Sequence, residues 1–298
     1  MKQVRSFPKV SVTRKAETGV LGGHPWIYDT EVTAAEPCEN GALADVFSRS
    51  GAYLGTGFYN EHSKIRVRLI SRNANDAFDE AFFERRLRYA WQYRKAVMGP
   101  DVSCCRVVFG EADAFPGLTA DRFENILVTQ TLSLGVERLK PMLFPLLRRV
   151  LAEDGVRIDG IYERNDAAIR ELEGMERNAG FFPLPGVPEP ELDRVPITEN
   201  GVRYLVDFKN GQKTGFFLDQ KYNRRAVARL CRGMRVLDCF TDTGSFALNA
   251  ALAGAESVRA VDISASAIGA AEENARLNGV EGKVGFEVAN VFDLLPRL

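Results

Sequence analysis

Regular alternation of strand-like and helix-like segments over the last hundred residues most limits how this 298-residue chain can fold. Nearly continuous apolar stretches at 235–240, 257–262 and 284–289 are separated by helical patterns at 245–253 and 266–277. Strands with unbroken apolar sequence are typical of parallel sheets buried on both faces. The alternation therefore predicts an α/β domain in which helices cover both faces of a parallel sheet.

Polar residues stand at the carboxyl ends of these predicted strands. Asp238 lies near the end of the first strand, Asp262 ends the second, and Asn290 follows the third. Ligands of open α/β sheets bind beyond such ends, next to turns like 241–244, where Gly244 lets a ligand approach the backbone. We expect Asp262 to accept both hydroxyls of a ribose and Asn290 to contact the edge of an adenine.

Two classes of cofactor fit an acid placed to bind a ribose. Dinucleotides need several glycines to hold a pyrophosphate at a helix N-terminus, whereas this turn has one glycine and two acids nearby, Asp238 and Asp242. Carboxylates repel phosphates and attract the cationic amino group and sulfonium of S-adenosylmethionine. The charge pattern favours S-adenosylmethionine over NAD, and the plainer alternative is that these acids only cap strands or helices.

Proline and glycine separate this domain from the chain before it. Five prolines between residues 181 and 196 exclude a helix or a central strand and indicate a linker. The segment 195–208 contains Asn200-Gly201, a pair typical of a tight hairpin turn. We therefore place the last domain at 191–298.

Residues 1–72 have the pattern of a small β-barrel made of short strands. These strand-like segments are 10–13, 44–47, 53–59 and 65–70. In the last of them Arg66 and Arg68 alternate with aliphatic residues, which predicts that one face of the strand is in contact with water.

Residues 73–190 predict a mixed α+β domain. A helix beginning near residue 76 carries an apolar stripe that we expect to pack in a core: Phe78, Phe82, Leu87, Tyr89 and Trp91. The other expected elements are strands at 106–109, 125–130 and 160–164 and a helix at 137–151.

Composition limits the function further. The net charge of −1 argues against a surface that is basic all over, and no apolar run is long enough to cross a bilayer. The first eight residues lack the apolar core of a signal peptide, so we expect a cytoplasmic protein. Five cysteines without a C-x-x-C pair and two histidines predict reduced thiols and no metal site.

Two stretches are locally basic. Before the first acid, Glu17, stand Lys2, Arg5, Lys9, Arg14 and Lys15. A longer run lies between Lys209 and Arg235. Asp219 is its only acid, and a solvated face is the plain interpretation of such a run. Its other basic residues are Lys213, Lys221, Arg224, Arg225, Arg229 and Arg232.

Several segments together resemble one known family. The segment 238–248, Asp-Cys-Phe-Thr-Asp-Thr-Gly-Ser-Phe-Ala-Leu, resembles motif I of a class I methyltransferase, and 213–220 resembles the cofactor motif that precedes it. The segment 22–28 resembles a PUA domain, an RNA-binding barrel, while 109–121 and 161–165 resemble the central domain of the same family. The chain is similar throughout to the PUA-containing 23S rRNA cytosine-C5 methyltransferases, whose last domain is Rossmann-like.

This resemblance implies methyl transfer from S-adenosylmethionine to C5 of a cytosine in 23S rRNA, with a homodimer as a further expectation. The cofactor-binding residues it implies are Thr214, Phe216, Asp219, Gln220, Asp238, Thr243, Gly244, Phe246, Asp262, Ile263, Asn290 and Val291. Phe216 has core packing as an equal alternative, and Asp219 has an N-cap role. RNA-binding residues are expected at Lys9, Arg14, Lys15, His24, Trp26, Arg66 and Arg68.

The resemblance also implies that catalytic parts are missing. C5 of cytosine is a poor nucleophile, so enzymes of this kind first add a cysteine thiolate to C6. The D-P-P motif and the catalytic cysteine of the family are expected beyond Leu298, and none of the five cysteines matches that nucleophile. We expect a catalytically silent chain whose methyltransferase domain is incomplete, with the strand at 236–240 as a bare apolar edge.

Three functions stay open from the sequence. The first is methylation of ribosomal RNA, at cytosine or at another base. The second is RNA binding without catalysis, through the barrel and the central domain. The third is nicotinamide-dependent oxidoreduction.

Overall fold

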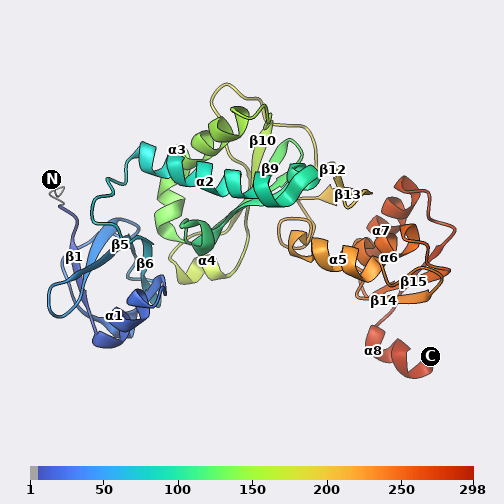
Figure 1. Cartoon of the computed structure of the whole chain (residues 1–298), viewed down its shortest axis with the longest axis horizontal. Helices are drawn as coiled ribbons and strands as arrows, with labels where there is room; N and C mark the ends of the chain where they lie inside the picture. Colours follow the sequence, from blue (N-terminus) through green and yellow to red (C-terminus); the bar gives the residue numbers. More distant parts are fainter. Residues whose placement is uncertain (1–5) are drawn as a thin grey trace. The chain divides into compact units, whose positions relative to one another are not determined.

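The computed structural model describes residues 6–298 and divides into two compact units, Met1–Glu191 and Leu192–Leu298 (Figure 1). Residues 1–5, part of the segment considered above for a signal peptide, lie outside the described residues. No helix among the described residues combines the length and the apolar character needed to span a bilayer. The division into domains at residues 72 and 190 stays a prediction.

The first unit begins with a six-stranded sheet that curls into a small barrel, in the order β2-β6-β5-β4-β1-β3. Its strands are β1 Lys9–Val12, β2 Trp26–Tyr28, β3 Val32–Ala35, β4 Leu43–Phe47, β5 Tyr53–Tyr59 and β6 Ile65–Ser71. Neighbouring strands are antiparallel except for β1 and β4. The four predicted strands are confirmed, and their apolar faces enclose a core around Val10, Ile27, Val46 and Val67.

A second sheet in the first unit has five strands, in the order β11-β10-β9-β8-β7. Its strands are β7 Cys104–Phe109, β8 Leu118–Phe123, β9 Ile126–Thr131, β10 Gly160–Asn165 and β11 Asn178–Phe181. Helices α2 (Glu80–Met98) and α3 (Leu134–Ala152) pack against each other beside this sheet (Figure 1). The predicted α+β pattern is confirmed, and β8 and β11 are strands that the sequence analysis did not identify.

The apolar stripe predicted on α2 is correct except at one position. Phe82, Leu87 and Trp91 are buried in a core shared with the sheet and α3, whereas Tyr89 is 59% exposed. Residues two positions apart do not share a helix face, so Tyr89 points away from the side on which Leu87 and Trp91 are buried. The prediction that Tyr89 packs in the core is therefore wrong.

The second unit opens with a hairpin of β12 (Arg194–Glu199) and β13 (Val202–Asp207). At the turn, Asn200 and Gly201 have φ angles of 55° and 80°. Two successive positive φ angles are those of a type I′ turn, which suits the twist of the flanking strands. Helix α5 (Lys221–Ala228) follows.

A parallel three-stranded sheet completes the second unit, in the order β14-β15-β16. Its elements are β14 Arg235–Cys239, α6 Ser245–Leu252, β15 Ser257–Asp262, α7 Ala265–Leu277, β16 Val284–Val288 and the short α8 Val291–Leu294. Helices α6 and α7 both contact β15. Among residues 6–298, β14 pairs with β15 alone and so forms an edge of this sheet.

The prediction that helices cover both faces of this sheet is wrong. On one face Leu237 is 36% exposed, and the side chains of the Arg259–Glu287 ion pair are 43% and 38% exposed. Two right-handed crossovers that step in the same direction place both of their helices on the same side. Helices α6 and α7 therefore leave the face of Leu237 and Arg259 open to water.

Candidate functional site

The turn that follows β14 is fixed by the carboxylate of Asp238. Its Oδ2 accepts hydrogen bonds from the Thr241 hydroxyl at 2.6 Å and from the Ala247 N–H at 3.0 Å. The backbone of this turn takes positive φ angles at Phe240 (61°), Asp242 (49°) and Gly244 (81°). Asp238 thus holds the turn against the first turn of α6.

Gly244 is required in this turn for two reasons. Its φ angle of 81° is one that residues other than glycine rarely adopt. A Cβ atom at this position would also lie 3.0 Å from the Cβ of Ala271 in α7. The glycine therefore allows α6 and α7 to pack closely at the edge where the strands end.

Asp262 joins the carboxyl ends of the three parallel strands. Its Oδ2 accepts the N–H of Asp242 at 2.9 Å, and its Oδ1 accepts the N–H of Ser264 at 3.0 Å. The backbone carbonyl of Asp262 accepts the N–H of Ala289 at 2.9 Å, which places Asn290 beside it. The acids and the amide predicted at the strand ends are therefore brought to one edge of the sheet.

The electrostatics of this edge favour a cation. Burial raises the pKa of Asp238 and of Asp242, and the charge of Asp262 raises both further. The hydrogen bonds from Thr241 and Ala247 lower the pKa of Asp238 but do not reverse the shift. A bound cation would favour the ionised form of each carboxyl, and a phosphate would be repelled.

The segment 213–220 lies before α5 and is held in place by one buried cation. Arg224, which is 1% exposed, forms an ion pair with Glu199 at 2.6 Å and donates to the Phe217 carbonyl at 2.6 Å. The charge of Arg224 also lowers the pKa of Asp242. This arginine therefore fixes the segment to the hairpin at Glu199, and its charge acts on the turn after β14.

Phe216 packs in the core of the second unit. It is 2% exposed, with its ring 5.0 Å from that of Tyr204 and 4.4 Å from the Arg224 guanidinium carbon. Core packing, the alternative given for Phe216, accounts for this position. Thr214 is buried in the same segment, and Phe246 is half-buried 5.9 Å from the same guanidinium carbon.

Asp219 does not cap a helix. It is exposed, and the N-cap of α5 is Gln220, whose side chain makes no capping hydrogen bond. The side chain of Gln220 instead accepts from Asn223 at 2.9 Å and donates to Asp219 at 3.2 Å. The N-cap role predicted for Asp219 is wrong because a short 3₁₀ turn, Leu218–Gln220, precedes the helix.

The other predicted cofactor residues differ in exposure. Ile263 is 70% exposed next to Asp262, whereas Val291 is 2% exposed. Asn290 is exposed, and its Oδ1 accepts the Phe292 N–H at 3.1 Å as the N-cap of α8. A carbonyl oxygen has two lone pairs, so this bond leaves one acceptor position available. The Thr243 Oγ1 is buried and has no hydrogen-bond partner among the described residues.

The predicted RNA-binding residues divide into two groups. Lys9, Arg14, Lys15 and His24 are exposed, and Arg66 is half-buried. By contrast, Arg68 is 8% exposed, so the prediction that it lies on a wet face is wrong. It forms an ion pair at 2.7 Å with Glu173, the C-cap of α4 (Ile169–Leu172) in the same unit.

Trp26 also contacts a residue close to the second sheet of the first unit. Its indole N–H donates to Glu111 at 2.7 Å, and its ring lies 5.6 Å from the Arg68 guanidinium carbon. The buried Glu173 accepts further hydrogen bonds from Asn60 and Ser63. Trp26 and Arg68 therefore connect the barrel to the second sheet of the first unit.

Comparison with known proteins places this geometry in a family. Residues 10–72 match a PUA-like domain, and residues 184–298 match an S-adenosylmethionine-dependent methyltransferase. A protein named ribosomal RNA large subunit methyltransferase I from Klebsiella pneumoniae (strain 342) is 38% identical over 294 residues, which cover 98% of this chain and 71% of the relative. The chain belongs to the ribosomal RNA large subunit methyltransferase I family.

Solved structures show the same fold. A Streptococcus mutans protein assigned as an S-adenosylmethionine-dependent methyltransferase superposes with a TM-score of 0.79 at 22% identity, covering 97% of this chain and 72% of that one. A methyltransferase-like protein complexed with S-adenosylhomocysteine superposes with a TM-score of 0.81 at 21% identity and the same coverage. The methyltransferase is thus a multidomain α/β protein with an N-terminal PUA-like barrel, a central α+β region and a Rossmann-like last domain.

The residues present fit S-adenosylmethionine, the cofactor of this family. The carboxylates at the strand ends suit its cationic groups, and the unpartnered Thr243 hydroxyl offers both a donor and an acceptor. The assignment of single residues to parts of the cofactor stays a prediction. None of these comparisons bears out the expectation of catalytic motifs beyond Leu298.

Sequence reasoning missed one aromatic pair at the site. The rings of Phe240 and Phe292 lie 5.8 Å apart and are 59% and 74% exposed, next to the ends of β14 and β16. Phe240 was assigned to a strand, whereas β14 ends at Cys239 and Phe240 has a positive φ angle of 61°. A helix signal at Asn290, a typical N-cap residue, was available to locate Phe292.

Proposed function

We propose that this chain binds S-adenosylmethionine and 23S ribosomal RNA for methylation at C5 of a cytosine. The relatives it matches are named for the large ribosomal subunit, and its barrel matches a PUA-like domain. The observation that carries the proposal is the single edge at which Asp238, Asp242 and Asp262 gather, because a cationic cofactor fits there and a dinucleotide does not.

Each residue of this edge has a proposed role. Asp262 accepts the ribose hydroxyls with the lone pairs not used by the N–H groups of Asp242 and Ser264. Asp238 and Asp242 face the cationic end, and Asn290 accepts from the adenine amino group. When bound, S-adenosylmethionine supplies a methyl group on a cationic sulfur.

We propose that none of the cysteines of this chain is the nucleophile that C5 chemistry needs. Burial raises the pKa of Cys38 and of Cys231, so both favour the unreactive thiol. Cys104 and Cys105 are 1% exposed in β7, and Cys239 lies within β14. The 298-residue chain is therefore expected to bind cofactor and RNA without completing the transfer.

RNA would bind the exposed basic residues of the barrel, Lys9, Arg14 and Lys15, together with His24 and the half-buried Arg66. The burial of Arg68 and the hydrogen bond from Trp26 to Glu111 support a connecting role for them instead. Neutralising phosphates with these side chains makes the affinity for RNA depend on salt.

Calorimetry with S-adenosylhomocysteine and with NAD tests the cofactor, and only the first should bind. Filter binding to a 23S rRNA transcript tests the RNA substrate, and footprinting should protect a segment that contains an accessible cytosine. A transfer assay with tritiated S-adenosylmethionine should give no label above an Asp262→Ala control. Label on a base other than cytosine would overturn the C5 assignment, and label at C5 would overturn the proposal about the cysteines.

A further inference from the structure

The second unit contains a cavity of about 490 Å³ that no part of the cofactor site uses. The hairpin turn at Asn200, the end of α6 at Leu252 and Ala253, and the region after α5 form its walls. None of the residues predicted to bind the cofactor lines it. Three arginines of the basic run identified in the sequence do: Arg225, Arg229 and Arg232.

These three arginines carry uncompensated charge. Arg225 lies in α5, Arg229 is the C-cap of that helix and Arg232 follows in a turn, and all three line the cavity. All three are exposed, no acid lines the cavity, and none of the three forms a salt bridge within residues 6–298. Three guanidinium groups around one cavity without a carboxylate make a site for an anion.

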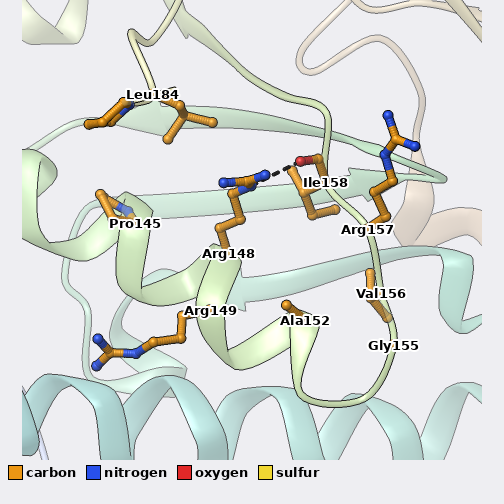
Figure 2. Close-up of a pocket in the computed structure, with 10 residues that line it drawn as sticks. Pro145, Arg148, Arg149, Ala152, Gly155, Val156, Arg157, Ile158 and Leu184 are labelled. Carbon is orange, nitrogen blue, oxygen red and sulfur yellow. Dashed lines mark hydrogen bonds between the residues drawn. The ribbon is translucent and has the colours of Figure 1, made fainter. Parts of the chain in front are cut away.

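A second arginine-lined cavity, in the first unit, shows the contrast. This cavity of about 530 Å³ is lined by Arg148, Arg149 and Arg157 (Figure 2). Arg149 pairs with Glu80 and Glu84, and Arg157 pairs with Asp159. Arg148 donates to the Ile158 carbonyl at 3.0 Å, as the dashed line in Figure 2 shows.

Neighbouring carboxylates and one backbone carbonyl thus pair with the arginines of that first cavity. Its arginines hold helices and loops of the first unit together and leave little net positive charge for a ligand. The cavity beside α5 has no such acids, so its positive charge is available to a partner.

An exposed aromatic ring lies next to the cavity beside α5. Tyr222 is 47% exposed, and the Arg225 guanidinium carbon lies 5.7 Å from the centre of its ring. Proteins that bind single-stranded nucleic acid combine a basic groove for the backbone with aromatic side chains on which bases stack. The pairing of Tyr222 with Arg225 favours RNA over a free anion.

We propose that this cavity binds the phosphodiester backbone of the RNA substrate. Arg225, Arg229 and Arg232 contact phosphate oxygens, and Tyr222 stacks on an unpaired base. This site in the methyltransferase domain adds to the RNA contacts of the barrel. The inference rests on the proposed function, since it takes RNA as the substrate.

Filter binding of the full chain to a 23S rRNA transcript tests this site. The variant Arg229→Gln/Arg232→Gln is compared with Arg276→Gln/Lys283→Gln, which removes the same charge from exposed positions of the same unit. We expect the first variant to bind at least about tenfold more weakly and to lower the salt slope by about 1.5, for two lost phosphate contacts. The control should stay within about twofold, and both should bind S-adenosylhomocysteine like the wild type.

Thermal melting separates a role in stability from a role in binding, because cations near a helix C-terminus also stabilise it. If the first variant melts at a lower temperature, Arg229→Lys/Arg232→Lys should restore the melting temperature. The RNA affinity of this lysine variant then tests the site without a loss of stability. Equal affinity of both double variants would overturn the site but leave the proposed function intact. A wild type that does not bind RNA would overturn both. If phosphatidylserine vesicles bound the chain through these arginines while RNA binding stayed unchanged, the site would be assigned to membranes instead.

Discussion

The carboxylate of Asp262 accepts the backbone N–H of Asp242 at 2.9 Å, across the ends of two neighbouring parallel strands. Its second oxygen accepts the N–H of Ser264, the residue that caps α7. One side chain therefore fixes the turn after β14 and the start of α7 together. The same side chain is the one proposed to bind the ribose.

Two variants of Asp262 should separate these roles. Asp262→Ala removes both hydrogen bonds and should destabilise the second unit by about 1–3 kcal/mol, because it leaves N–H groups unpaired. Asp262→Asn keeps one acceptor oxygen and should cost less stability while still weakening S-adenosylhomocysteine binding at least about tenfold. Urea unfolding and calorimetry measure the two effects. Unchanged binding by Asp262→Ala would remove the proposed ribose contact.

Gly244 and Gly269 provide a matched pair of substitutions. Gly244→Ala should destabilise the protein by about 1–3 kcal/mol, since its φ angle is positive and its new Cβ would meet Ala271 at 3.0 Å. Gly269→Ala, in α7, has open space around the new Cβ and should stabilise the helix by about 1 kcal/mol. Thermal denaturation of both variants checks the signs, and two changes of the same sign would contradict this account of the turn.

The raised pKa of Asp242 predicts how stability depends on pH. A carboxyl whose pKa is higher in the folded chain binds its proton more readily there, so its contribution is present at low pH and lost as pH rises through the raised value. Asp242→Asn should therefore be more stable than the wild type at pH 7, and the difference should shrink as the pH approaches the ordinary value of 3.8. Urea unfolding at both pH values tests this, and a constant difference would refute it.

The buried pair of Arg224 and Glu199 should matter for stability. Arg224→Met leaves a buried carboxylate without this partner and should cost about 3–5 kcal/mol. The double variant Arg224→Met/Glu199→Leu should recover much of that loss, because it removes both charges of the pair. Arg225→Met, one position along and exposed, is the control and should change stability by less than about 0.5 kcal/mol. Guanidinium chloride unfolding gives all three values.

Arg68 and Arg66 lie on the same strand but should behave differently. Arg68→Met breaks the buried ion pair with Glu173 and should lower stability by about 3–5 kcal/mol. Arg66→Met should leave stability nearly unchanged and weaken binding to 23S rRNA, with a smaller salt slope. Thermal melting and filter binding of the two variants give the comparison. The reverse pattern would show that the barrel binds RNA through the buried arginine.

Local patterns predicted much of the fold. The hairpin at Asn200-Gly201 follows from two residues that tolerate positive φ angles. The parallel order of β14, β15 and β16 follows from alternating strands and helices, and it brings Asp238 and Asp262 to one edge without further information. Such features depend on short stretches of sequence and on the handedness of their connections.

Features that depend on distant partners could not be predicted. Arg68 looked solvated because its strand alternates, yet its partner Glu173 lies 105 residues further along the chain. Arg224 similarly finds Glu199 through tertiary packing, and Phe216 packs against Tyr204 rather than at the strand ends. Pattern alone also did not show that two crossovers in one direction leave a sheet face open.

The buried carboxylate of Glu173 has a mechanical consequence for the first unit. It accepts hydrogen bonds from Asn60, Ser63 and Arg68, so moving the barrel away would break a buried network of several hydrogen bonds at once. We therefore expect the barrel and the second sheet to move together. If Arg14 and Lys15 bind RNA as proposed, they do so from a fixed position relative to the second sheet.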